Sequence, residues 1–165
     1  MPRVYVSIGS NIERTRHIQA AIDALRARFG PLALSPVYET AAVGFAGQPF
    51  YNLVAAFDSD LPPAALDALF KELEAASGRV RGGEKFAPRT LDVDLLLWGD
   101  AVLDEGPLRL PRDEIERYAF VLQPLAELAP DLRHPLSGET MAELWRRAQA
   151  EGRMAPAPRA HWQPA

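Results

Sequence analysis

The sequence predicts an α+β fold of the ferredoxin-like type, a two-layer sandwich in which helices cover a mostly antiparallel sheet. Its elements follow the order strand, helix, strand, strand, helix, strand, then shorter pieces. The chain has 165 residues, 48% of them hydrophobic and 24% charged, which suits one globular domain with its own core. We therefore expect a single domain over residues 1–150, and a loosely held tail rich in proline and alanine over residues 151–165.

The first strand and helix are predicted from apolar spacing. Apolar residues alternate over residues 4–8, which is typical of a strand, and Gly9 ends it. Ser10 and Glu13 have the spacing of a capping box and predict that a helix begins here. Gly30 stops this helix, whose apolar face carries Ile18, Ile22, Leu25 and Phe29.

Proline and glycine mark the boundaries of the central elements. Residues 32–38 predict a strand in which Pro36 marks an edge or a bulge. A loop over residues 40–49 leads to a buried strand over residues 50–57. Residues 60–78 then predict a helix with proline in its first turn.

The second half is expected to consist of shorter elements. A loop over residues 78–90 precedes a strand over residues 91–98, and a turn at Gly99 and Asp100 lets residues 101–103 complete a hairpin with that strand. The remaining pieces are helices at 113–118 and 121–128, broken by Pro124, and a last helix at 141–150.

Composition excludes several classes of function. The chain has no cysteine, so it has no disulfide, thiolate metal site, iron–sulfur cluster or cysteine nucleophile. A net charge of -4 and a pI near 5.4 disfavour a general nucleic-acid binder. No apolar run reaches the ~18 residues that a membrane span needs, and the N-terminus lacks the pattern of a signal peptide. We therefore expect a cytoplasmic protein with no membrane partner.

Two carboxylates interrupt the apolar strand over residues 91–98. Side chains alternate along a strand, so Asp92 and Asp94 point the same way, roughly 7 Å apart. Two such charges repel each other and are costly to desolvate, and a bound divalent cation such as Mg²⁺ removes both problems. The alternative is an exposed sheet face that carries two ordinary acids.

The loop before this strand is basic. It carries Arg79, Arg81, Lys85 and Arg89 against the single acid Glu84. Guanidinium groups beside metal-binding carboxylates suit a metal–polyphosphate complex, because arginine grips phosphate oxygens in a bidentate manner. The alternative is a solvated basic loop that pairs with nearby acids.

Residues 85–96, Lys-Phe-Ala-Pro-Arg-Thr-Leu-Asp-Val-Asp-Leu-Leu, resemble the signature of the 6-hydroxymethyl-7,8-dihydropterin pyrophosphokinase family of folate biosynthesis. The resemblance covers roughly residues 3 to 136. Within this span, the other matching segments are residues 8–11, 38–40, 50–52, 78–81 and 120–125.

The resemblance implies a reaction in which the hydroxymethyl oxygen of the pterin attacks the β-phosphorus of ATP and AMP leaves. Asp92 and Asp94 would hold two Mg²⁺ ions, and Arg79 and Arg89 would stabilise the transferring phosphates. It places ATP beside Glu74, Arg79, Arg81, Phe86, Arg89, Leu95, Arg109, Arg112 and Tyr118. It places the pterin beside Thr40, Ala41, Val43, Phe50, Asn52 and Phe120. It also implies a monomer that acts on small molecules.

The sequence departs from the family pattern in one segment. Arg112 stands where the family has histidine, and Tyr118 stands where it has arginine. This leaves two alternatives to the family activity: a paralogue that acts on a related pterin, and a non-catalytic module that binds pterin or nucleotide. Without the resemblance, core packing would be the favoured role of Phe50 and Phe120.

Overall fold

The main sheet is antiparallel throughout. The computed structural model describes residues 1–41, 48–78 and 91–165. Within them the central strand β1 (Arg3–Ser10) lies between β4 (Phe50–Asp58) and β5 (Asp92–Trp98). Two short strands, β2 (Ala33–Leu34) and β3 (Tyr38–Thr40), pair with the other side of β4.

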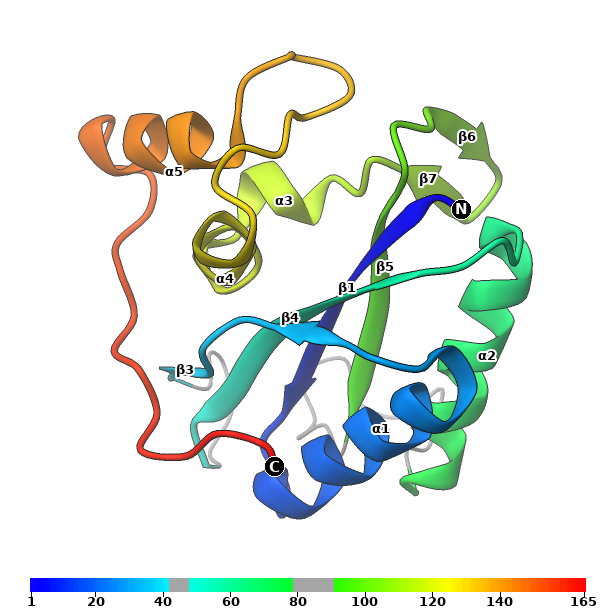
Figure 1. The fold of residues 1–165 in the computed structure, drawn as a ribbon. Coiled ribbons are helices and arrows are strands. Elements are labelled where there is room, and N and C mark those ends of the chain that lie inside the picture. Colours follow the sequence, from blue (N-terminus) through cyan, green and yellow to red (C-terminus); the bar gives the residue numbers. More distant parts are fainter. Residues whose placement is uncertain (42–47, 79–90) are drawn as a thin grey trace.

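Two helices connect the strands and cover one face of the sheet. Helix α1 (Arg14–Phe29) follows β1, and α2 (Pro63–Ala76) joins β4 to β5 (Figure 1). Proline stands in the first turn of α2, as predicted. This order and pairing confirm the ferredoxin-like α+β fold. The core under these helices includes the fully buried Val4, Val6 and Ile8 of β1, which alternate with residues of the opposite face.

The opposite face of the sheet carries a further layer. Helices α3 (Glu114–Arg117), α4 (Ala119–Leu128) and α5 (Met141–Ala150) lie on that side (Figure 1). Their apolar side chains form a second core with sheet residues that include Tyr5, Val54 and Leu96. The ferredoxin-like unit is therefore covered on both faces, and this second cover also supplies one wall of the site described below.

Pro36 divides the predicted strand over residues 32–38. β2 ends at Leu34 and β3 begins at Tyr38, so the expected irregularity is confirmed. Ser35 bridges the gap, because its main-chain N–H donates to Val54 O (2.9 Å) and its hydroxyl accepts from Val54 N (2.9 Å). Pairing with β4 therefore continues up to the proline, which has no N–H to donate.

The predicted capping box is wrong. Helix α1 begins at Arg14, and its N-cap is Glu13, in the left-handed conformation and without a side-chain cap. The hydroxyl of Ser10 instead bonds with the main chain of Ile12, accepting from its N–H (3.4 Å) and donating to its carbonyl (3.2 Å). Ser10 ends β1, and this local turn competes with the cap.

The predicted hairpin after β5 is also wrong. Residues 101–103 do not pair with β5; instead β6 (Leu103–Glu105) pairs with β7 (Leu108–Leu110) in a separate two-stranded sheet. Gly106 opens the connecting turn with φ 61°, a conformation that favours glycine at the first central position of a tight hairpin.

Pro124 does not break a helix. It lies inside α4 and is buried there, and the interruption falls instead at Tyr118, between α3 and α4. A proline in a helix interior costs about 3 kcal/mol. The residues around it, from Val121 to Ala126, are all buried, and four of them belong to the second core, so that their packing offsets the cost.

The expectation of a loosely held tail is not met by residues 153–165. They lie along the edge of β3 and end beside α1 (Figure 1), with main-chain hydrogen bonds to both Val37 and Glu39.

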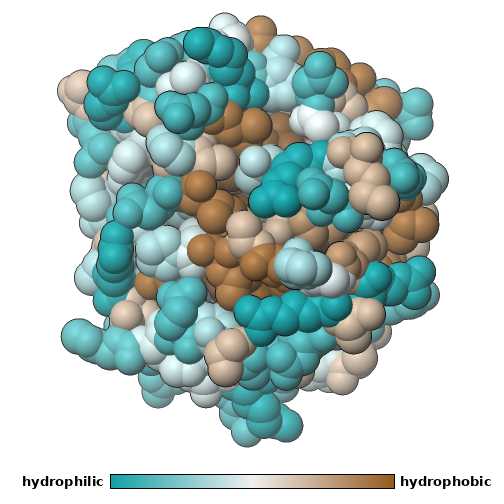
Figure 2. Space-filling view, in the orientation of Figure 1, coloured by the Kyte–Doolittle hydropathy of each residue, from teal (hydrophilic) through white to brown (hydrophobic). Residues whose placement is uncertain are grey.

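On the face shown in Figure 2, hydrophobic surface gathers in a hollow near the middle, surrounded by polar side chains. In the described part of the chain, no helix combines the length and apolar character that a bilayer crossing needs.

Candidate active site

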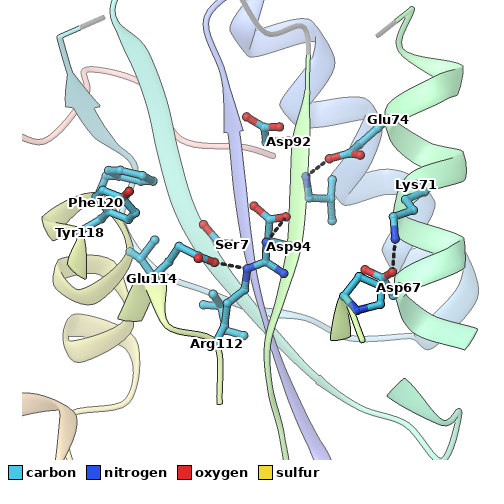
Figure 3. Close-up of a pocket in the computed structure, with 14 residues that line it drawn as sticks. Ser7, Asp67, Lys71, Glu74, Asp92, Asp94, Arg112, Glu114, Tyr118 and Phe120 are labelled. Atoms are coloured by element: carbon cyan, nitrogen blue, oxygen red, sulfur yellow. Dashed lines mark hydrogen bonds and ion pairs between the residues drawn. The ribbon is translucent and has the colours of Figure 1, made fainter. Parts of the chain in front are cut away.

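The two aspartates of β5 share one face of the sheet, as predicted. In the antiparallel pairing with β1, Asp92 lies opposite Gly9 and Asp94 lies opposite Ser7. Val93, between them, is buried in the core on the opposite face. Figure 3 shows both carboxylates on the open side of the strand. The apolar alternation of β5 therefore fixes the direction of both carboxylates.

These carboxylates line a cavity of about 470 Å³. It lies between β5, helix α2 and the segment that leads into α4 (Figure 3). Among the described residues that line it, five are acidic and two are basic: Asp67, Glu74, Asp92, Asp94 and Glu114 against Lys71 and Arg112. This part of the cavity is therefore negative and would repel a polyanion unless cations accompany it.

Asp94 has a perturbed pKa in this cavity. Burial raises its pKa to about 6; the Arg112 guanidinium opposes that rise, while the nearby acids Asp92, Glu74 and Glu114 add to it. Arg112 Nη2 lies 3.5 Å from Asp94 Oδ1, and its Nε donates to Glu114. Arg112 thus stands between two carboxylates and partly compensates their charge.

Glu74 fixes β5 to α2. Its side chain is almost wholly buried, and Oε2 accepts a hydrogen bond from the main-chain N–H of Val93 (2.9 Å). Val93 lies between the two aspartates, so this bond holds the strand at the point from which they project (Figure 3). The resemblance assigned Glu74 to ATP contact, and the structure adds this positioning bond.

The donor set fits Mg²⁺. In residues 1–41, 48–78 and 91–165 no group of three or more His, Cys, Asp or Glu side chains could hold a metal on its own. Mg²⁺ does not require such a cage, because it keeps several waters and is commonly held by one or two carboxylates together with substrate phosphates. Asp92 and Asp94 supply those carboxylates.

An aromatic pair forms the wall across from the aspartates. The rings of Tyr118 and Phe120 stack at a centroid distance of 5.0 Å and an interplanar angle of 24°. Both rings are partly exposed, at 43% and 36%, and both line the cavity (Figure 3). A flat, apolar ligand would gain burial and stacking there.

The remaining predicted pterin residues with described positions lie on β4 and at the end of β3. Thr40 pairs with Phe50, and Asn52 Nδ2 donates to Thr40 Oγ1 (3.0 Å). Ala41 directly follows Thr40. The structure brings these residues together, but they do not line the cavity that holds the aspartates.

Gly9 joins these two parts of the site. It pairs with Asp92 on one side and with Asn52 on the other. A Cβ at Gly9 would lie 2.5 Å from Asn52 Oδ1, which is too close for any other residue without a shift. Sequence reasoning ended a strand at Gly9 and included it in the family resemblance, but did not predict this contact, although glycine inside a strand indicates a close approach.

The remaining residues predicted to contact the substrates do not line the aspartate cavity or are not described by the structure. The Leu95 side chain is buried in the core on the far side of β5, so a contact with ATP would have to come from its main chain. Arg109 of β7 lies 3.5 Å from Asp113 and does not line the cavity. Arg79, Arg81, Phe86, Arg89 and Val43 lie outside the described residues.

Sequence reasoning missed four polar groups of the cavity wall, of which Glu114 of α3 is one. Asp67 and Lys71 of α2 form an i, i+4 ion pair, a pattern that usually indicates a solvent-facing helix surface. Ser7 occupies the polar position of an alternating strand and gave no further signal. The packing of α2 beside β5 brings Asp67 and Lys71 to the aspartates, and the pairing of β1 with β5 places Ser7 opposite Asp94.

Comparison with known proteins identifies the family. Residues 5–130 match the family described as 7,8-dihydro-6-hydroxymethylpterin-pyrophosphokinase. This chain belongs to that family. A 2-amino-4-hydroxy-6-hydroxymethyldihydropteridine pyrophosphokinase of Pseudomonas aeruginosa is 44% identical over 154 residues, covering 91% of this chain and 94% of the relative. A relative of the same name from Methylorubrum extorquens is 38% identical over 147 residues, covering 87% and 91%.

Solved structures agree with the pyrophosphokinase fold. A Plasmodium falciparum HPPK-DHPS triple mutant superposes with a TM-score of 0.74 at 12% identity. The match covers 91% of this chain and 42% of that longer chain, so this chain spans less than half of its length. At this identity the likeness shows the fold alone, which is the one predicted from element order.

Proposed function

We propose that this protein transfers the pyrophosphoryl group of ATP to the hydroxymethyl oxygen of 6-hydroxymethyl-7,8-dihydropterin, releasing AMP. One observation carries the proposal. The family match over residues 5–130 includes Asp92 and Asp94, and these carboxylates project together into a cavity with a negative lining. The names of the relatives give the substrate class, and the site supplies groups suited to it.

The proposed role of the two aspartates is to bind metal ions. Asp92 and Asp94 would hold two Mg²⁺ ions, and bound Mg²⁺ supplies charge neutralisation and alignment of the phosphate oxygens. Glu74 keeps the main chain of β5 in place between the two ligands. The carboxylates therefore face the cavity before ATP arrives, and less reorganisation is needed on binding.

The phosphates of ATP need cations as well. Arg79, Arg81 and Arg89 are proposed to grip them, with Arg89 and Arg79 stabilising the charge of the transition state. Arg112 lies close enough to Asp94 to meet a phosphate held on the metal. Further contacts to ATP are proposed for Glu74, Phe86, Leu95, Arg109 and Tyr118.

The pterin side of the site is aromatic and polar. Phe50 and Phe120 are proposed to stack on the two faces of the ring system, which is flat and bicyclic. Thr40 and Asn52 would recognise its donors and acceptors, together with the neighbouring main chain at Ala41 and Val43. The hydrogen bond between Asn52 and Thr40 supports this, because it holds both side chains in fixed orientations.

The transfer itself requires little covalent chemistry from the protein. The hydroxymethyl group releases its proton as its oxygen forms a bond to the β-phosphorus, and the bond from that phosphorus to the oxygen of the α-phosphate breaks. AMP leaves with that oxygen. The chain's contribution is to bind both substrates in line and to exclude water, which would otherwise accept the same group.

A direct assay tests the proposal. Mixed with Mg-ATP and 6-hydroxymethyl-7,8-dihydropterin, the protein should release AMP, and release of ADP or of no nucleotide contradicts it. Asp92→Ala and Asp94→Ala should each reduce turnover about a hundredfold or more, because each removes a metal ligand. Asp100→Ala, at an exposed turn outside the cavity, is the matched control and should keep normal turnover.

The same assay separates the two alternatives. Tight binding of pterin and ATP with no AMP over hours would indicate a binding module. A clear preference for another pterin alcohol in a substrate panel would indicate a paralogue. The departures from the family pattern at Arg112 and Tyr118 motivate this alternative. We further propose that the protein acts as a monomer in the cytoplasm.

A further inference from the structure

The C-terminal strap, defined as residues 153–165, closes the outer edge of the sheet. It leaves α5, passes along β3 and ends beside α1 (Figure 1). Ala160 N donates to Val37 O (2.8 Å), and Glu39 N donates to Pro158 O (2.9 Å). Tyr38 and Arg159 form an isolated antiparallel bridge between these bonds. The strap therefore occupies the hydrogen-bonding edge that β3 would otherwise present to solvent.

Side chains fix the strap at both ends. The Gln123 side chain of α4 accepts from Ala157 N (2.8 Å) and donates to Ala157 O (3.2 Å). Gln163 accepts from Val37 N (3.1 Å) and donates to Ser35 O (3.0 Å). The Gln123 amide holds the main chain of Ala157, and the Gln163 amide bridges Val37 and Ser35, so the strap has a defined register along β3.

The strap also contacts the ribbon formed by β3 and β4 through an aromatic stack. The rings of Trp162 and Tyr51 lie parallel, with centroids 5.9 Å apart and an interplanar angle of 6°. The Arg14 guanidinium lies 3.7 Å from the centre of the Tyr51 ring. Arg14 also donates to Pro49 O (2.8 Å) and lies 3.4 Å from the Glu39 carboxylate.

These contacts fall on one face of the ribbon. Glu39 and Tyr51 are paired, and their side chains point to the face that carries Arg14 and Trp162. By alternation, their neighbours Thr40, Phe50 and Asn52 point to the other face. The strap thus holds the edge and the back of a ribbon whose front carries the residues proposed to bind the pterin.

We propose that the C-terminal strap positions the pterin-binding face of the β3–β4 ribbon, with Trp162 and Gln163 as positioning residues. The inference rests on the proposed function. β3 is only three residues long and pairs with β4 on one side, so its orientation depends on what covers the other side. A ribbon held before binding loses less freedom when the ligand arrives, which favours affinity for the pterin.

The position of the strap predicts a selective effect. It has no residue among those that line the aspartate cavity. Loosening it should therefore weaken pterin binding and leave ATP binding unchanged. A strap that served stability alone would affect both substrates together, or neither of them.

Substitution of Trp162 tests this. In Trp162→Ala we expect the KM for 6-hydroxymethyl-7,8-dihydropterin to rise about tenfold, while the KM for ATP stays within about twofold. Trp162→Phe, which keeps a flat ring against Tyr51, should recover most of the loss. His161→Ala, an exposed neighbour on the same strap, is the control and should match the wild type.

A second variant and a binding measurement complete the test. Gln163→Ala removes the bonds to Val37 and Ser35 while keeping the aromatic stack, and should also raise the KM for the pterin alone. The Kd of the pterin, from its own fluorescence, should follow the KM. An unchanged pterin Kd and KM in a folded variant, or equal rises for both substrates, would overturn the inference. Failure of the wild type to release AMP would instead contradict the proposed function.

Discussion

At the scale of single residues, the metal-binding role proposed for Asp94 conflicts with the stability of the folded protein. Burial raises the pKa of this carboxyl to about 6, against an ordinary value of 3.8, so the folded protein without metal disfavours the charge that a metal ligand must carry. Arg112 relieves this cost in part. A bound divalent cation would relieve it further. We therefore expect the buried Asp94 carboxylate to destabilise the metal-free protein.

The first prediction follows from that conflict. Above pH 6 the carboxylate of Asp94 is ionised in both states, and the cost of holding it in the folded state is fully present. Below pH 3.8 it is neutral in both states, and the cost is absent. In EDTA, Asp94→Asn should therefore raise Tm relative to the wild type at pH 8, and the difference should disappear near pH 4.

Thermal unfolding at several pH values measures this effect. Asp100→Asn, on an exposed turn, serves as the control and should show no such pH-dependent gain. A lower Tm for Asp94→Asn at pH 8 would show that the ion pair with Arg112 outweighs burial. The variant should at the same time lose turnover, because an amide is a poor ligand for Mg²⁺.

Residue patterns predicted the direction of the aspartates, but not their surroundings. Alternation along β5 was enough to place Asp92 and Asp94 on one face, because the apolar side chains between them must be buried. Nothing in the sequence placed Lys71 beside them, since its pairing with Asp67 satisfies a helix surface equally well. The close approach of Asn52 to Gly9 depends on the pairing of two strands far apart in the chain.

At the scale of elements, Glu74 couples helix α2 to strand β5. Its carboxylate accepts the Val93 N–H in a buried setting. Glu74→Ala leaves that N–H without this acceptor and should lower the free energy of unfolding by about 1–3 kcal/mol. Glu74→Gln keeps an acceptor oxygen at the same position and should cost much less.

Urea denaturation of the two variants separates the charge of Glu74 from its uncharged contacts. Their difference reports the hydrogen bond to Val93 together with the packing of the side chain, because both lack the charge of Glu74. Equal losses in the two variants would mean that the charge, and not the bond, ties α2 to β5. The m-values should agree with that of the wild type, which confirms that the same surface unfolds in each protein.

Elements were predictable where one apolar face dominates. The elements β1, α1 and α2 were predicted from the spacing of apolar residues, and the strands predicted at 50–57 and 91–98 and the helix predicted at 141–150 correspond to β4, β5 and α5. The errors occurred where local signals compete. Pro124 reads as a helix breaker, yet the packing of α4 overrides it. Ser10 reads as a cap, yet it forms a turn with Ile12.

At the scale of the whole molecule, packing of remote segments builds the site. The strap after α5 returns to β3, and α4 brings Phe120 to the cavity that holds the aspartates (Figure 1). Composition predicted a loosely held tail, because prolines and few apolar residues do not form regular structure. They do not prevent docking, since Gln163 and Trp162 make specific contacts that no periodicity reveals.

The charge of the cavity leads to the last prediction. Its described lining has five acids and two bases, so it should accept a nucleotide only together with divalent cations. An ATP analogue with a methylene group between the α- and β-phosphates cannot transfer its pyrophosphoryl group and reports binding alone. With Mg²⁺, at about 100 times its Kd, it should stabilise the protein by about 2.7 kcal/mol, a rise in Tm of roughly 5–10 °C for a chain of this size.

Differential scanning fluorimetry measures that rise. In EDTA the same analogue should give almost no shift, and Asp92→Ala and Asp94→Ala should reduce the shift seen with Mg²⁺. Asp100→Ala should keep it in full. An equal shift with and without Mg²⁺ would contradict the role of the paired aspartates, because the basic side chains alone would then hold the phosphates against five carboxylates.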